Sequence, residues 1–250
     1  MAIVKKLFWY ELRRLMGNKF FLGLLLVSAF FSFWVMEGEI ILGVANTAPF
    51  SPWSFGAYMA KSLPVPVIAL LFFISFLYSK QEQAVKVLTV ATPIRPLRFR
   101  LLRYGAIGVS FLTIFLVPLG YAVWFYETTF HFADFGSLIS PLLFMLLPVL
   151  FFFWGLGLLA GRLHPALVFA LMPAALLLTL LPLPAAWDLY GTAFFTGYPQ
   201  TLSVLDPAFS VPLPVVLGRC AYSLAGAGML AAATALPDHT CGKGSRDMVR

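Results

Sequence analysis

The side chains of this 250-residue chain that could do chemistry are few, and they form no recognised catalytic or metal-binding pattern. The three histidines, His131, His164 and His239, are scattered without ligand spacing, and two cysteines are too few for a four-cysteine metal site. Glu37 and Glu39, together with His131, are the nearest candidates for acid–base catalysis, and they match no known motif. We therefore expect no catalytic residue, no metal and no cofactor to belong to this chain.

The stretch between residues 80 and 103 combines charge with a short apolar pattern. Residues 81–91 contain no helix breaker, and a residue that precedes proline resists the α conformation, so we predict a short helix that ends at Thr92-Pro93. A contact with another protein would bury the apolar side chains of this helix and use the flanking charges for orientation. The residues of this predicted contact are Glu82, Val85, Leu88, Val90, Pro93 and Arg95. The alternative interpretation is a solvated basic loop that contacts lipid.

A second patterned stretch, residues 4–15, precedes the first apolar run. On a helix its apolar side chains share one arc and its basic side chains the other, which predicts an amphipathic helix in the membrane interface. Glu11 falls inside the apolar arc, and Arg14, three residues later, is its predicted partner. Anchoring in lipid and contact with a cytoplasmic partner remain equal alternatives. The residues that define this interfacial helix are Leu7, Phe8, Glu11 and Arg14.

The composition decides which elements must position these residues. Hydrophobic residues make up 61% of the chain and charged residues 11%, and the mean hydropathy is +0.91. A soluble domain is only about 45–50% apolar and about 25% charged, so this chain belongs in a bilayer. The net charge of +7 then indicates anionic lipid and membrane orientation, and no nucleic-acid partner is expected.

Stretches without Asp, Glu, Lys or Arg mark the expected membrane spans. They are 20–36, 62–79, 104–126, 135–161 and 165–187, with a sixth, 207–237, interrupted only by Arg219, which we expect to reach outward to the membrane surface. The predicted fold is all-α, a polytopic membrane protein with six transmembrane helices. Residues 1–19 would form a cytoplasmic interfacial segment, 20–236 the transmembrane domain and 237–250 a cytoplasmic tail.

The distribution of charge predicts the orientation. With six spans, all but two of the 17 Lys and Arg residues fall on one side, the exceptions being Lys61 and Arg219. The basic side is cytoplasmic in membrane proteins, so both termini should lie inside, in the cytoplasmic (inner) membrane of a bacterium or archaeon. Acids of the outer loops are expected to be solvated and dispensable for assembly. They include Glu37, Glu39, Asp188 and Asp206.

The segment after the second span resembles the membrane subunits of ABC type-2 exporters. In that family an acid, a short coupling helix and a Thr-Pro turn with basic residues lead into the third helix. Here these features are Glu82, residues 85–90, Thr92-Pro93-Ile94-Arg95 and residues 97–103. The interfacial helix and the six spans match the family as well. Family members often have a glycine shortly after the acid, whereas this chain has Gln83-Ala84-Val85.

The resemblance implies a permease that works as a dimer with a second permease subunit, either a copy or a paralogue. It also implies two ABC ATPase (nucleotide-binding) subunits, which bind ATP and Mg, because this chain has no phosphate-binding Gly-x-x-x-x-Gly-Lys-[Ser/Thr] loop. The coupling helix would transmit their motion to the membrane helices. A short helical or re-entrant element is expected outside, within residues 188–215. The cargo stays open among polar, lipid-like, peptide and drug molecules.

Two other classes remain as alternatives: a polytopic membrane enzyme and a haem-anchoring electron-transfer subunit. Both normally show clustered carboxylates or histidines at membrane depth, which the predicted spans lack. A proton- or sodium-driven carrier would need an ionisable residue deep inside a span, and we expect none here.

Overall fold

A computed structural model describes residues 2–79, 96–202 and 204–235. All regular elements in these residues are helices, which confirms the predicted all-α fold for the described part of the chain. The predicted contact residues from Glu82 to Arg95 and the tail 237–250 lie outside the described residues. The helices are α1 (Ala2–Met16), α2 (Lys19–Val35), α3 (Pro52–Ser62), α4 (Pro64–Leu77), α6 (Pro96–Phe130), α7 (Gly136–Leu163), α8 (Pro165–Leu177), α9 (Thr192–Thr201) and α10 (Leu213–Ala235), with a π-helical turn, η1 (Met36–Ile40), after α2.

Five helical stretches of the described residues are long and apolar enough to cross a membrane. A crossing takes about 20 residues. The stretches are Lys19–Ile40, Pro52–Leu77, Leu97–Phe130, Gly136–Leu163 and Leu213–Ala235. The membrane class predicted from composition therefore agrees with the helices that form.

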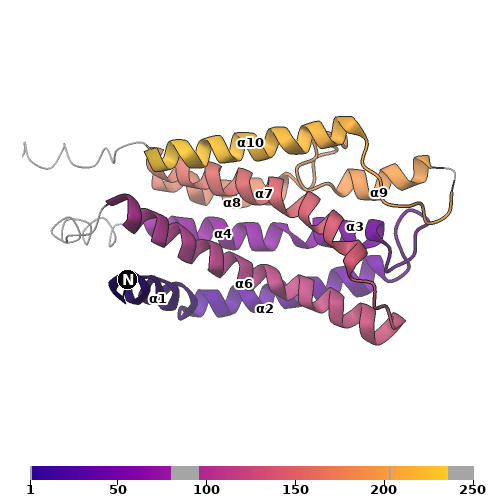
Figure 1. Ribbon diagram of the computed structural model, residues 1–250, viewed down its shortest axis with the longest axis horizontal. Helices are drawn as coiled ribbons and strands as arrows, with labels where there is room; N and C mark the ends of the chain where they lie inside the picture. Colours follow the sequence, from indigo (N-terminus) through magenta and orange to yellow (C-terminus); the bar gives the residue numbers. More distant parts are fainter. Residues whose placement is uncertain (1, 80–95, 203, 236–250) are drawn as a thin grey trace, which may run out of the picture.

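The long helices run side by side in three layers (Figure 1). The middle layer is α3 and α4, with α1, α2 and α6 on one side and α7, α8 and α10 on the other. A helix that is apolar all round must be covered on every side, and α4 is of this kind. Its Leu70, Leu71 and Phe73 side chains are fully buried. By contrast α2 and α10 are the least buried spans, which leaves their outer apolar faces for lipid.

The elements gather at two ends of the bundle (Figure 1). One end holds α1, the first turns of α6, the turn from α7 to α8 and the last turn of α10, and we call it the α1 end. The opposite end holds the loop after η1, the turn from α6 to α7, and α9, and we call it the α9 end. Segments predicted to be cytoplasmic and segments predicted to be outside are thus separated, as the six-span topology requires.

The second span begins ten residues earlier than predicted. The charge-free run starts at residue 62, but the helix starts at Pro52, where the Ser51 hydroxyl caps it by accepting the Ser54 N–H at 3.2 Å. Lys61 therefore lies inside the span, where its ammonium group pairs with the Glu39 carboxylate. Because the Glu39 carboxylate partly neutralises the ammonium group, Lys61 is tolerated inside the span. A search for charge-free runs does not detect such a pair and therefore places the start of the span too late.

The fifth predicted span, 165–187, is helical only in its first half. α8 ends at Leu177 after 13 residues, which is too short to cross by itself. Pro182 and Pro184 follow, and residues that precede proline disfavour the helix, so the chain continues without a regular helix until α9. α8 starts at the α1 end and α9 lies at the opposite end (Figure 1), so this half-helical run connects the two ends.

Small residues let α7 approach its neighbours closely within the chain. A Cβ atom at Gly226 of α10 would collide with the backbone of Phe151 and Phe152, and one at Gly157 would lie 2.9 Å from the Leu71 and Ile74 side chains of α4. Glycines of α7 and α10 thus allow close packing of helices within this chain.

Candidate functional site

The helix predicted over residues 4–15 is present as α1, and its apolar face packs on the first half of α6. Leu12 and Leu15 are buried, whereas Lys5 and Arg13 are exposed, as the helical arc predicts. Phe8 lies beside Gly105 of α6, where an added Cβ would be 3.6 Å from the Phe8 ring. α1 is thus held by this chain's own helix, in addition to any contact with lipid.

Glu11 is the centre of an ion-pair cluster between α1 and α6. Its side chain is buried, with one carboxylate oxygen 3.6 Å from Arg14 Nη1 and the other 3.7 Å from Arg103 Nε. The predicted pairing with Arg14 is confirmed. Arg103 was not predicted as a partner, because it follows Glu11 by 92 residues and no local spacing relates the two. The cluster ties α1 to the first turns of α6.

Both flanks of segment 80–95 are anchored at the α1 end (Figure 1). On one flank Tyr78, which caps α4, donates its hydroxyl to the Leu158 carbonyl of α7 at 2.8 Å, and its ring lies against Gly161. On the other flank α6 begins at Pro96 and carries the Arg103 contact to α1. The chain on the two sides of this segment is therefore fixed to α7 and to α1.

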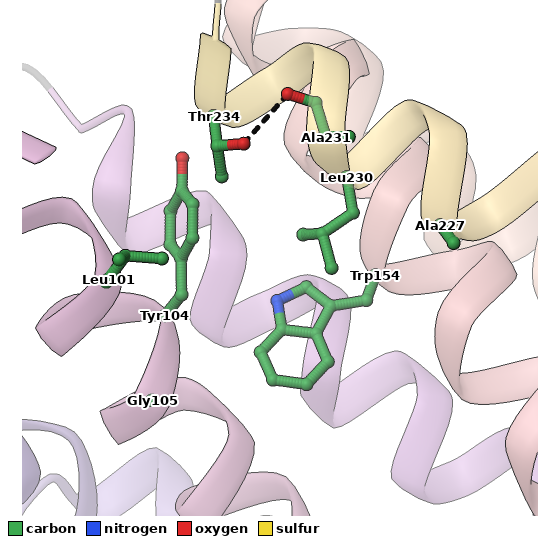
Figure 2. A pocket seen from close by; sticks show the side chains of 8 residues that line it. All are labelled: Leu101, Tyr104, Gly105, Trp154, Ala227, Leu230, Ala231 and Thr234. Atoms are coloured by element: carbon green, nitrogen blue, oxygen red, sulfur yellow. Dashed lines mark hydrogen bonds between the residues drawn. The ribbon is translucent and has the colours of Figure 1, made fainter.

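A groove of about 450 Å³ opens near this end, between α6, α7 and α10 (Figure 2). Its lining consists of Leu101, Tyr104, Gly105, Trp154, Ala227, Leu230, Ala231 and Thr234. The surface is almost entirely apolar, and the Thr234 hydroxyl is donated to the Ala231 carbonyl at 2.8 Å. The sequence analysis did not identify this groove, because its walls come from three helices far apart in the chain.

Trp154 closes the deep side of the groove. The indole ring reaches across from α7 to Gly108 of α6, where a Cβ would lie 2.6 Å from the ring. The ring nitrogen turns toward the space between Tyr104 and Leu230 (Figure 2). This N–H is buried and has no hydrogen-bond partner within the described part of the chain.

At the α9 end, Arg219 is buried instead of reaching outward as predicted. α10 starts at Leu213, so Arg219 lies within the helix, and only 3% of it is exposed. Its guanidinium donates to the Leu189 carbonyl and stacks 5.5 Å from the centre of the Phe144 ring. The cation thereby fastens the non-helical segment before α9 to α10 and α7.

Asp188 is also buried, which contradicts its prediction as a solvated outer acid. Its two carboxylate oxygens accept the N–H groups of Tyr190 at 3.1 Å and Ala193 at 2.7 Å, so it caps the start of α9. Its negative charge also acts on Arg219. A short helix forms within residues 188–215, as expected, and it is α9. Asp188 and Arg219 fix the residues that lead into it.

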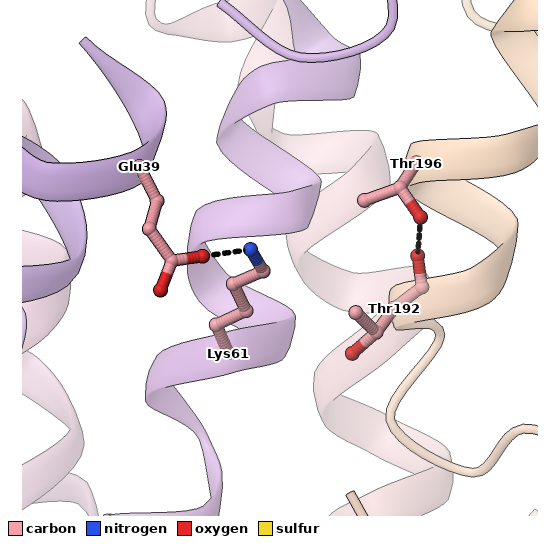
Figure 3. A network of polar contacts seen from close by, with 4 residues as sticks. All are labelled: Glu39, Lys61, Thr192 and Thr196. Carbon is pink, nitrogen blue, oxygen red and sulfur yellow. Dashed lines mark hydrogen bonds and ion pairs between the residues drawn. The ribbon is translucent and has the colours of Figure 1, made fainter. Parts of the chain in front are cut away.

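A second charged pair lies toward the same end, where Lys61 of α3 meets Glu39 of η1 (Figure 3). Both side chains are partly exposed. On the neighbouring α9 the Thr196 hydroxyl donates to the Thr192 carbonyl of its own helix, and in the described residues neither threonine is hydrogen-bonded to the pair. The expectation of spans without charged residues is thus wrong for Lys61 and Arg219. Lys61 is paired with Glu39, and Arg219 donates to the Leu189 carbonyl.

The described residues contain no group of three or more His, Cys, Asp or Glu side chains placed to hold a metal ion. His164 is used as a helix cap, because its Nδ1 accepts the Ala166 N–H at 3.2 Å. Comparison with protein-family models, with curated proteins and with solved structures finds no match for this chain.

Proposed function

We propose that this chain is the transmembrane permease subunit of an ATP-driven ABC type-2 exporter. It would pair with a second permease subunit and with two ABC ATPase subunits, which bind ATP and Mg. The observation that carries the proposal is the construction of the α1 end. There the buried Glu11 joins α1 to Arg103 of α6, directly after the segment expected to dock on the ATPase.

The topology expected of such a subunit has support in the helix arrangement. Five helical stretches are long and apolar enough to cross a membrane. α8 together with residues 178–191 connects the two ends of the bundle, as a sixth crossing would. The basic residues of α1 and of the first turns of α6 lie at one end, and this end would face the cytoplasm of a bacterium or archaeon.

The proposed mechanism uses α1 and α6 as one body. ATP binding closes the ATPase subunits and displaces the coupling segment, which moves the start of α6. Because Glu11 and the Phe8–Gly105 contact hold α1 to α6, the interfacial helix follows. The two membrane halves then exchange one access state for the other, a rigid-body change of the kind known for switching proteins.

The coupling segment provides the decisive experiment. Leu88→Asp would bury an unpaired carboxylate at the contact with the ATPase, at a cost of several kcal/mol. We expect the variant to insert normally in the membrane, to recover much less ATPase subunit on co-purification, and to lose transport-stimulated ATP hydrolysis.

Gln83→Asp serves as the matched control, because it adds the same carboxylate outside the predicted apolar positions. Undiminished recovery of the ATPase by Leu88→Asp would refute the coupling assignment. If the wild-type chain purified from its native membranes brings down no ATP-hydrolysing subunit, the permease proposal itself fails.

A further inference from the structure

The groove of Figure 2 faces the lipid. Its rim residues Leu101, Gly105, Ala227 and Ala231 are exposed, and they come from α6 and α10, two candidate spans between which the groove opens. The medium in front of such an opening is the bilayer itself. Its volume of about 450 Å³ is within the range of small-molecule sites, which are mostly apolar with a few placed polar groups.

Among the polar groups that line the groove, one is both buried and without a hydrogen-bond partner in the described residues. The Trp154 indole N–H is buried, faces the groove and is unpaired in the described part of the chain. A buried donor without an acceptor is costly in an apolar medium, and a hydrocarbon chain alone would leave it unpaired. An occupant with an acyl carbonyl would supply the missing acceptor.

The charge around the groove favours an anionic occupant. Arg98 is exposed and precedes Leu101 and Gly105 by three and seven residues, which places it on the same face of α6. Phe8 of α1 lies beside Gly105, which lines the groove, and the exposed Lys5 belongs to the same basic helix. The nearby acid Glu11 is already paired with two arginines. Basic residues at the membrane surface attract anionic lipid head groups.

We propose that the groove binds one anionic acylated lipid from the leaflet at the α1 end. The acyl chain lies along Tyr104 and Leu230, an acyl carbonyl accepts the Trp154 N–H, and the head group faces Arg98. This site goes beyond the proposed function, because it requires neither ATP nor an ATPase subunit.

Native mass spectrometry of the delipidated full chain can test the site with phosphatidylglycerol and phosphatidylcholine of identical acyl chains. We expect the wild type to retain one phosphatidylglycerol in preference to phosphatidylcholine. Trp154→Phe removes one hydrogen bond and should weaken retention about twofold to tenfold. Arg98→Gln should reduce the preference for the anionic head group.

Ala231→Phe should fill the groove and abolish retention, whereas Ala225→Phe, on the same helix but outside the lining, should leave retention unchanged. Ala227→Phe repeats the test if Ala231→Phe misfolds by circular dichroism. Equal retention of the two lipids by the wild type, or full retention by a folded groove-filling variant, would overturn the proposal. If the lipid is not retained but the ATPase subunit is recovered normally, the lipid site is refuted and the permease proposal stands. If the lipid is retained but no ATPase subunit is recovered, the permease proposal is refuted and the lipid site stands.

Discussion

Among single residues, Asp188 combines two tasks that a solvated acid would not have, since it caps α9 and offsets the charge of Arg219. Asp188→Ala would leave the buried N–H of Tyr190 and the partly buried N–H of Ala193 without an acceptor, and it would remove the negative charge that acts on Arg219. A buried unsatisfied donor costs about 1–3 kcal/mol, so we expect a loss of at least that size in the free energy of unfolding. Thermal unfolding in detergent, followed by circular dichroism, measures it.

The matched control for this prediction is Asp134→Ala, which removes the same group at an exposed turn. Surface substitutions of this kind usually stay within about 0.5 kcal/mol. Equal melting shifts for the two variants would show that Asp188 is no more structural than a surface acid.

At the scale of helices, the close approach of α7 and α10 depends on glycine at two facing positions, Gly155 of α7 and Gly226 of α10. Gly226→Ala would force a Cβ into the backbone of Phe151 and Phe152, and overpacking of this kind costs about 1–3 kcal/mol. Gly228 has open space around its Cβ position, so Gly228→Ala should be neutral or stabilise α10 by up to about 1 kcal/mol. Resistance to unfolding by denaturant should therefore fall for the first variant only, and a fall in both would contradict the packing assigned here.

For the whole molecule, the decisive question is whether residues 165–191 carry the chain across the membrane. If they do, both termini lie on one side, and Cys241 in the tail should react with a membrane-impermeant maleimide only after the cells are opened. Thr201→Cys, introduced at an exposed position of α9 into a background with both native cysteines replaced by serine, should react in intact cells. Labelling of Cys241 from outside intact cells would leave five crossings and refute the six-span topology.

The sequence by itself determined what depends on local composition and short spacing. The average hydropathy marks the membrane class and the approximate position of most spans, and the helical arc marks α1 with its Glu11–Arg14 pair, because residues three apart are neighbours on any helix. The predicted contact residues from Glu82 to Arg95 and the tail remain predictions.

Only the tertiary structure decided which charges are tolerated inside the bundle and where a groove forms. Lys61 enters a span because Glu39, 22 residues earlier, meets it, and Arg219 is buried because the Leu189 carbonyl reaches it from 30 residues away. The groove at Trp154 likewise needs three helices packed around it. The physical reason is common to all three: the cost of burying a polar group depends on its partners in space, and no local average along the chain contains those partners.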